Sequence, residues 1–357
     1  MQQSKRVVMK KALSLTIGLI FLLQGCTDGF NFRSDDGVLS SIGTTFQHPF
    51  CNTLFRQYKK NKGITILDNE YNTGTGIRAL QDRTVDFAAS DAILSEQEIK
   101  EFKSEILSIP VCLGAIVITY NLPEVDDLKL SSALLAGIFL KKIEKWNDPA
   151  IKAINPELDL PDLKITVVSS SDESGSNYIF SEYLSKTNQE WAQTMGKGKS
   201  INWESDIAVN KNMLVATAVK QITGSITYLG MEHAAMLGLS KAILQNASGE
   251  YVSATKESIR VAAEIDYSND MRIMITNSAN KGAYPLACYS FLLVYKNQAY
   301  AHRSQTKKNI LKDFLLFAVR PEQQKLANSM TYVPLPDQVV EIAKKQIESI
   351  VWNKDER

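Results

Sequence analysis

Two kinds of segment alternate along the chain, namely short apolar runs and longer runs with apolar residues at helical spacing. Short apolar runs between polar or Gly-containing stretches are typical of buried strands. The pattern predicts strands at 63–67, 85–89, 115–120, 165–169, 226–229 and 291–294. It predicts helices at 77–81, 131–139, 178–184 and 310–319, and near the C-terminus a helix that carries Val339, Ala343, Ile347 and Ile350 on one face. Alternating strands and helices predict an α/β fold.

The first 26 residues have a different pattern. Basic residues between Lys5 and Lys11 precede an uncharged run, 12–23, that is too short for a bilayer span of about 20 residues. This order predicts a secretory signal peptide, residues 1–25, with Met9 as an alternative start. Leu23-Gln24-Gly25-Cys26 is similar to a bacterial lipobox, which implies lipid on Cys26; an ordinary signal peptide with an incidental cysteine is the alternative.

A lipid-modified Cys26 implies a membrane-anchored bacterial protein of the periplasm or cell surface. Residues 26–37 are polar and contain glycine, so we expect a flexible tether there and a folded part that begins near Val38.

Charge and length narrow the function classes. The 357 residues, 44% of them apolar, are enough for two hydrophobic cores. Lys and Arg number 40 against 39 acidic residues, and removing the four basic residues of the signal leaves 36 against 39. Such a chain lacks the positive potential that nucleic-acid-binding proteins need. An anionic ligand would have to be held by the local arrangement of a few residues and not by the net charge.

Three cysteines remain after the signal, and an odd number argues against a disulfide framework. Cys112 and Cys288 lie in the apolar runs 109–120 and 284–295, whereas Cys51 lies elsewhere. Small buried thiols are the favoured interpretation, and a Cys112–Cys288 bridge is the alternative.

Three segments place hydroxyls and glycine where a helix begins: 43–46, 73–77 and 172–176. Helix N-termini carry unpaired amides and partial positive charge, so with hydroxyl groups they form anion sites. Each segment alone is equally typical of an N-cap or a turn. None of them matches a P-loop or a Rossmann fingerprint.

An apolar run ending at Ser90 is followed by Asp91, where α/β proteins place ligand contacts. An ionised carboxylate accepts hydrogen bonds and cannot donate them. Phosphate near neutral pH still has a proton to donate, whereas sulfate has none and would face an unpaired buried charge. Asp91 therefore predicts a site that selects phosphate over sulfate.

The chain resembles the phosphate-binding lipoproteins of the high-affinity phosphate ABC transporter, the PstS family, over residues 38–350. The resemblance is carried by an ordered series of motifs: Ile42-Gly43-Thr44-Thr45-Phe46 with Pro49, the segment Thr84 to Asp91 with Leu94-Ser95, Ile138-Phe139-Leu140 through Lys145-Trp146-Asn147-Asp148, Asn155-Pro156, Gly224-Ser225-Ile226-Thr227-Tyr228, and Tyr284-Pro285.

The resemblance implies a two-lobed type II periplasmic-binding-protein fold with two crossing hinge strands, 109–120 and 284–295. Lobe I would be 38–115 plus 290–357, and lobe II 116–289. It also implies a monomer that binds inorganic phosphate without metal or cofactor and delivers it to ABC permease subunits. The implied phosphate contacts are Thr45, Phe46 through its amide, Thr73, Asp91, Ser170, Asp172, Ser174, Gly175 and Ser176.

Three positions depart from the family pattern. Ser170 stands where the family has an Arg that contacts the anion, which leaves Asp172 without that partner. Glu173 stands in place of a common Gly, and 210–213 replaces a Gly-rich run. Either another cation, such as Arg78 or Lys211, reaches the site, or the protein senses phosphate or binds a different oxyanion.

A lipid-anchored serine hydrolase is the rival class. Ser174 would be the nucleophile, with Asp172 nearby and a base among the three histidines, His48, His233 and His302. No Gly-x-Ser-x-Gly elbow frames Ser174, and no His-x-x-x-His or Cys-x-x-Cys spacing indicates a metal. The sequence therefore predicts a binding protein and not an enzyme.

Overall fold

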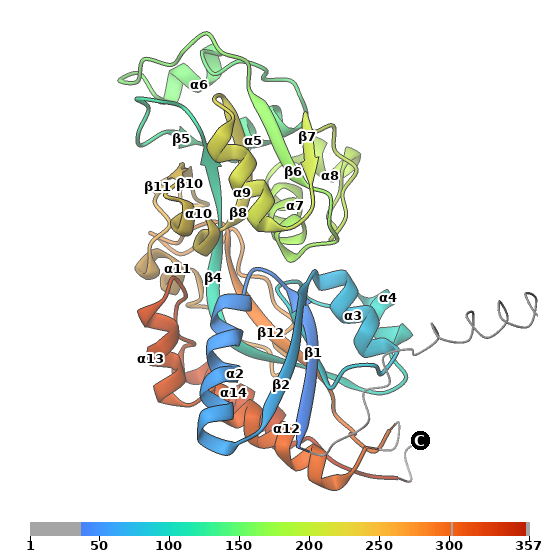
Figure 1. Cartoon of the computed structure of the whole chain (residues 1–357). Helices are drawn as coiled ribbons and strands as arrows, with labels where there is room; N and C mark the ends of the chain where they lie inside the picture. The colour runs from blue at the N-terminus through green and yellow to red at the C-terminus, as the bar shows by residue number, and fades with distance from the viewer. Residues whose placement is uncertain (1–36, 301–302, 355–357) are drawn as a thin grey trace, which may run out of the picture. The chain divides into compact units, whose positions relative to one another are not determined.

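The computed structural model describes residues 37–300 and 303–354, which belong to one compact unit (Figure 1). The predicted signal peptide, Cys26 and all but the last residue of the tether lie outside the described residues. Within the described part, no helix has both the length and the apolar character needed to cross a bilayer.

In the part of the chain that the structure describes, nine strands form one mixed sheet. Eight of them lie in the order β2-β1-β3-β12-β4-β8-β6-β7, and β9 pairs with β4. The remaining three form a small sheet in the order β11-β10-β5. The strand bounds are β1 Val38–Thr44, β2 Thr65–Tyr71, β3 Phe87–Ser90, β4 Ile106–Tyr120, β5 Lys129–Leu130, β6 Thr166–Ser170, β7 Ile207–Val209, β8 Ser225–Gly230, β9 Ser240–Lys241, β10 Ile243–Gln245, β11 Tyr251–Val252 and β12 Ala287–Tyr295.

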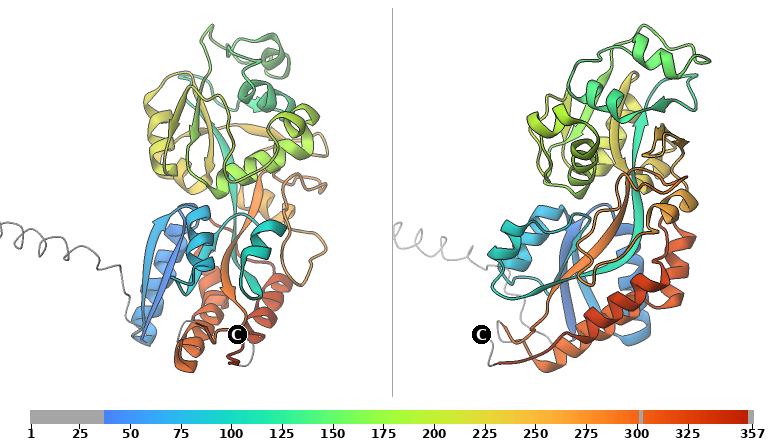
Figure 2. Two further views of the ribbon diagram at one scale, coloured as in Figure 1. Left: turned by 90° about the vertical axis from the view of Figure 1, so that its right-hand side faces the viewer. Right: turned by 180° about the vertical axis from the view of Figure 1, so that it is seen from behind.

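The 15-residue strand β4 belongs to both halves of the large sheet. Residues 106–115 pair antiparallel with β12, and residues 116–120 pair antiparallel with β8. Figures 1 and 2 show β4 passing from the elements around β1 to those around β8. The two runs predicted to cross are therefore strands, and they lie side by side.

The helices that the sequence pattern predicts are all present, but their bounds differ: the helix predicted over 131–139 is Ser132–Phe139, and Ile350 lies beyond the end of the C-terminal helix. A helix over 48–62 was missed, although its buried Phe50, Leu54 and Tyr58 repeat every four residues. The bounds are α2 His48–Lys62, α3 Thr73–Gln81, α4 Glu96–Glu101, α5 Ser132–Phe139, α6 Pro149–Ile154, α7 Gly175–Thr187, α8 Gln189–Thr194, α9 Asn212–Gln221, α10 Met231–Leu237, α11 Lys256–Ala262, α12 Gln305–Ala318, α13 Pro321–Ser329 and α14 Asp337–Glu348.

Separate aromatic clusters fill the two halves of the core. Around β8, Phe180 stacks on Tyr228 with 4.4 Å between ring centroids, and Trp203 packs against both. Around β3, Phe87 stacks on Phe314 at 5.4 Å. Aromatic pairs at these distances stabilise a core beyond the area they bury.

The three cysteines of the described chain are buried and unbridged. Cys112 lies opposite Ser290 in the β4–β12 ladder, and Cys288 lies opposite Gly114, so the two thiols are neighbours on adjacent strands. Burial raises the pKa of each thiol well above its usual range. The structure thus agrees with buried thiols and contains no bridge between Cys112 and Cys288.

Candidate functional site

The candidate site lies where strands end and helices begin. The loop after β1 carries Thr45 and Phe46, and α3 begins at Thr73 one residue after β2. Asp91 follows directly on β3, and residues 171–174 connect β6 to α7. Parallel pairing of β2, β1 and β3 brings the ends of these strands to one edge of the sheet.

Thr73, Asp91 and Gly175 lie against one another. A methyl group on Gly175 would be 2.7 Å from Cβ of Asp91, 3.0 Å from its Oδ2 and 3.2 Å from Oγ1 of Thr73. The N-terminus of α7 therefore approaches the end of β3 and the start of α3 so closely that a side chain at position 175 would clash. Three predicted ligand residues from separate parts of the sequence are adjacent in space.

Three of the predicted ligand oxygens are buried without a hydrogen-bond partner. They are Oγ1 of Thr73, Oδ2 of Asp91 and Oγ of Ser176. Buried polar atoms in folded proteins are paired in the large majority of cases, and each exception calls for a reason such as a bound ion. Two hydroxyl donors and one carboxylate acceptor match the hydrogen-bonding needs of a protonated oxyanion.

Asp91 is fully buried, and Ser290 donates a hydrogen bond of 2.7 Å to its Oδ1. Burial raises the pKa of Asp91 to about 7, although the hydroxyls of Thr44 and Ser290 favour the carboxylate. Glu232 nearby raises this pKa further, and His233 lowers it. The buried surroundings of Asp91 therefore favour its protonated form more than water does.

The loop after β1 has its own polar contacts. Asn212, the first residue of α9, donates from Nδ2 to Oγ1 of Thr45 at 2.8 Å. The amide of Phe46, predicted to contact the anion, donates instead to Oγ1 of Thr44 at 3.1 Å. Asn212 was not among the predicted residues, although its segment was noted as a departure from the family pattern.

The residues at and after Ser170 are braced by main-chain amides. Oγ of Ser170 accepts from the amide of Asp172 at 3.2 Å, and Oδ2 of Asp172 accepts from the amide of Lys211 at 2.5 Å. Asp172 lacks the arginine partner because Ser170 stands at that position, but its carboxylate is paired with a peptide NH instead. Lys211 holds Asp172 through its backbone amide.

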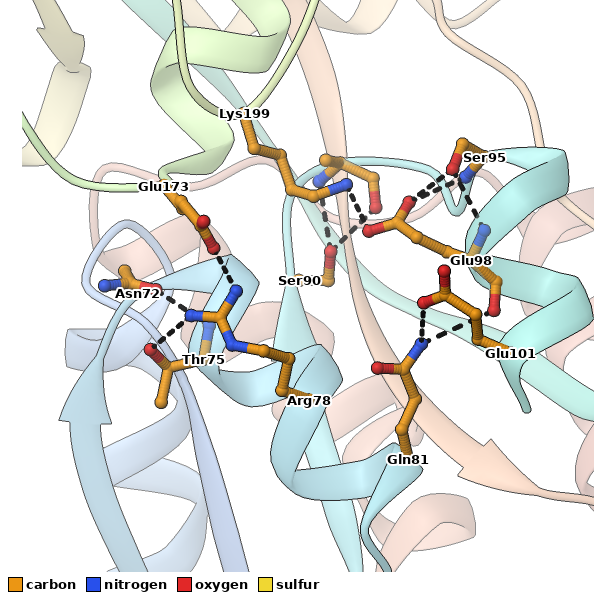
Figure 3. A network of polar contacts seen from close by, with 11 residues as sticks. Asn72, Thr75, Arg78, Gln81, Ser90, Ser95, Glu98, Glu101, Glu173 and Lys199 are labelled. Atoms are coloured by element: carbon orange, nitrogen blue, oxygen red, sulfur yellow. Dashed lines mark hydrogen bonds and ion pairs between the residues drawn. The ribbon is translucent and has the colours of Figure 1, made fainter. Parts of the chain in front are cut away.

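Arg78, predicted as one of two substitutes for the family's Arg, has its guanidinium engaged by Glu173 and Thr75. Its guanidinium pairs with the carboxylate of Glu173 and also donates to Oγ1 of Thr75 at 3.3 Å (Figure 3). The main chains of these two segments are also in contact, because the amide of Gly74 donates to the carbonyl of Glu173 at 3.0 Å. The carboxylate of Glu173, which stands where the family commonly has Gly, is directed to Arg78.

The contacts of Ser174 do not favour the hydrolase hypothesis. Its Oγ caps α7 by accepting from the amide of Asn177 at 3.1 Å. His48 is held by Asp68 and Glu70, and His233 by Glu232, whereas His302 lies outside the described residues. Neither described histidine contacts Ser174.

Comparison with known proteins gives consistent similarities. A model of the PBP superfamily domain matches residues 33–322. The phosphate-binding protein PstS of Xylella fastidiosa is 38% identical over 316 residues, which is 87% of this chain and 84% of its own. The protein of the same name from Methanocaldococcus jannaschii is 32% identical over 98% of both chains.

Solved structures have the same fold. A high-affinity periplasmic phosphate-binding protein (PfluDING), solved with bound phosphate, aligns with a TM-score of 0.67 at 17% identity over 88% of this chain and 99% of its own. An ancestral soluble variant of the human phosphate-binding protein gives 0.68 at 17% over 86% and 93%. These similarities confirm the predicted type II periplasmic-binding-protein fold.

Proposed function

Because the chain belongs to the PstS family of phosphate-binding proteins, we propose that it captures inorganic phosphate outside the cytoplasm and delivers it to an ABC permease. The observation that carries the proposal is the set of buried, unpaired oxygens on Thr73, Asp91 and Ser176. Each belongs to a residue that the family resemblance assigns to the anion. No enzyme activity is part of the proposal, since the family consists of solute-binding proteins.

Binding depends on neutral donors and one carboxylate. Hydroxyls of Thr73 and Ser176 donate to phosphate oxygens, and the amides at the start of α7 add partial positive charge. Oδ2 of Asp91 accepts the phosphate proton, which sulfate lacks. Thr45, Phe46, Ser170, Asp172, Ser174 and Gly175 complete the proposed site.

Two lobes enclose the anion in this proposal. Lobe I comprises 38–115 and 290–357, and lobe II comprises 116–289. The shared strand β4 and the two separate aromatic clusters support this division. Thr45, Thr73 and Asp91 then belong to one lobe and 170–176 to the other, so phosphate stabilises the closed form by contacting both.

We also propose that residues 1–25 are removed as a signal peptide and that lipid on Cys26 anchors a monomeric protein to the membrane. Mass spectrometry of the membrane-bound form tests this. The expected N-terminal peptide begins at a diacylated Cys26, and an unmodified Cys26 would contradict it.

Calorimetric titration of the purified protein with phosphate, arsenate and sulfate tests the function. Phosphate and arsenate, which carry a proton at neutral pH, should bind, and sulfate should not. No heat and no thermal stabilisation at millimolar phosphate would refute the proposal. Preferential binding of another oxyanion would favour the alternative ligand.

A further inference from the structure

Two ion pairs connect the segment 172–199 to α3 and α4 (Figure 3). Arg78 of α3 pairs with Glu173, and Glu98 of α4 pairs with Lys199, whose Nζ lies 2.6 Å from its Oε1. The polarity is opposite in the two pairs. Glu173 is acidic and Lys199 basic, although both belong to the segment 172–199 that carries the start of α7.

Lys199 also supports the anion loop through its main chain. Its carbonyl accepts from the amide of Ser174 at 2.9 Å and from Nδ2 of Asn177 at 3.1 Å. These two contacts fix the N-cap of α7, next to Gly175 and Ser176. One residue therefore braces the loop with its backbone and reaches α4 with its side chain.

The two pairs differ in burial. The side chains of Lys199 and Glu98 are 15% and 18% exposed, whereas those of Arg78 and Glu173 are 56% and 43% exposed. Exposed pairs contribute little because water and salt screen them. The Lys199–Glu98 pair is consequently the stronger electrostatic connection.

Contacts at the N-terminus of α4 hold the side chain of Glu98 independently of Lys199. It forms a capping box with Ser95, whose amide donates to Oε2 of Glu98 at 2.9 Å. Burial acts to raise the pKa of Glu98, but hydrogen bonds from Lys199 and Ser95 outweigh it and lower the pKa below the usual value. The Lys199 ammonium also lies 5.8 Å from the ring centroid of Tyr178.

We propose that Lys199 is a positioning residue for anion retention: its ion pair with Glu98 holds the 172–176 loop against Thr73 and Asp91 and slows release of the bound anion. This inference rests on the proposed function. Neither Lys199 nor Glu98 is among the residues assigned to the anion. The pair forms between the loop segment and α4, so it acts on the closed form and not on the initial encounter with phosphate.

The experiment measures phosphate association and release by stopped flow for wild type, Lys199→Met, Glu98→Gln and the double variant. Lys197→Met is the matched control, because Lys197 is exposed and has no ion pair among the described residues. Release should accelerate about 1.5- to 5-fold in Lys199→Met, with a smaller change in association. Lys197→Met should behave as wild type.

Coupling distinguishes positioning from a general packing effect. Lys199→Met should accelerate release much less in the Glu98→Gln background than in wild type, because the pair is already broken there. Arg78→Met should accelerate release less than Lys199→Met does, because the Arg78–Glu173 pair is more exposed. Raising the salt concentration should reduce the effect of Arg78→Met further.

Unchanged release in both Lys199→Met and Glu98→Gln would overturn the inference alone, as would additive effects in the double variant. If Lys199→Met does not fold, Glu98→Gln decides, since it removes the charge and leaves the Lys199 carbonyl in place. Absence of phosphate binding by the wild type would instead refute the proposed function, and the inference with it.

Discussion

Gly175 lies against Asp91 so closely that a methyl group on it would be 2.7 Å from the Cβ of the aspartate, a separation that real Cβ atoms do not adopt. The two residues are 84 positions apart in the sequence and come from α7 and the end of β3. Their contact brings the helix N-terminus to the carboxylate, which makes this junction sensitive to a single added carbon.

Gly175→Ala should weaken phosphate binding. The added methyl group must displace Asp91 or Thr73, and such overpacking costs about 1–3 kcal/mol, or roughly 5- to 150-fold in affinity. Calorimetric titration measures the change, with a thermal melt of the ligand-free variant as control. An affinity equal to that of wild type would show that Asp91 and Thr73 make room for the methyl group without a loss of binding free energy.

Asp91→Asn should bind sulfate. An amide donates a hydrogen bond where the carboxylate can only accept one, so the unpaired negative charge that opposes sulfate disappears. Charged hydrogen bonds contribute about 1.5–3 kcal/mol, so the preference for phosphate should fall by roughly 10- to 150-fold. Competition titrations give the ratio directly, and unchanged selectivity would exclude this role for Asp91.

Ser170→Arg should tighten phosphate binding by a similar factor, about 10- to 150-fold. Position 170 is buried at the end of β6, and Arg78 is occupied by Glu173, so no guanidinium of the described residues is assigned to the pocket. Ser170→Met, which has a long side chain and no charge, is the control. Equal affinities for the two variants would mean that the charge adds nothing.

The contribution of Asp91 to the stability of the ligand-free protein should be lost as the pH rises from about 4 to about 7. Burial raises the pKa of Asp91 to about 7, against about 3.9 in an unfolded chain. In this window the folded state retains a proton that the unfolded state has released, so the stabilisation is lost as pH rises.

Urea unfolding at several pH values compares wild type with Asp91→Asn, which does not titrate at this position. Wild-type stability should fall relative to the variant by an amount on the order of a few kcal/mol, and the difference should be constant above pH 7. Parallel profiles would contradict the raised pKa.

Asp86→Ala should destabilise the fold without involving the pocket. Asp86 pairs with Arg303, and its Oδ2 accepts from the amide of Ser40 at 2.7 Å. Both ionic side chains are buried, and removing one partner of a buried pair costs about 3–5 kcal/mol. Urea unfolding measures the loss. Glu257→Ala, which breaks an exposed pair with Arg260, should leave the stability close to that of wild type.

Local pattern was sufficient for the parts of the site that lie at element ends. Thr73 begins α3 and Asp91 follows β3. The apolar residues of these elements repeat with the expected period, so the position of both residues at element ends was predictable. The hydroxyl and glycine pattern also indicated the segment 172–176, and the family resemblance assigned Ser174, Gly175 and Ser176 within it to the anion. The predicted strands and helices are confirmed as elements, but the strand predicted over 115–120 is only the end of β4, which begins at Ile106.

Pairings between distant segments could not be predicted. Asn212 contacts Thr45 across 167 positions, and Arg78 contacts Glu173 across 95, and no period in the sequence encodes either contact. Arg78 was one of two candidate substitute cations, beside Lys211, because a charge alone does not indicate its partner. The fold decides by bringing Glu173 to it.

The three buried thiols provide a built-in chemical reporter. Cys51, Cys112 and Cys288 are at most 2% exposed, and burial raises the pKa of each, so the native fold withholds the reactive thiolate from alkylating reagents. Because β4 and β12 hold two of them in the shared sheet, iodoacetamide would reach these sulfurs only when that sheet opens.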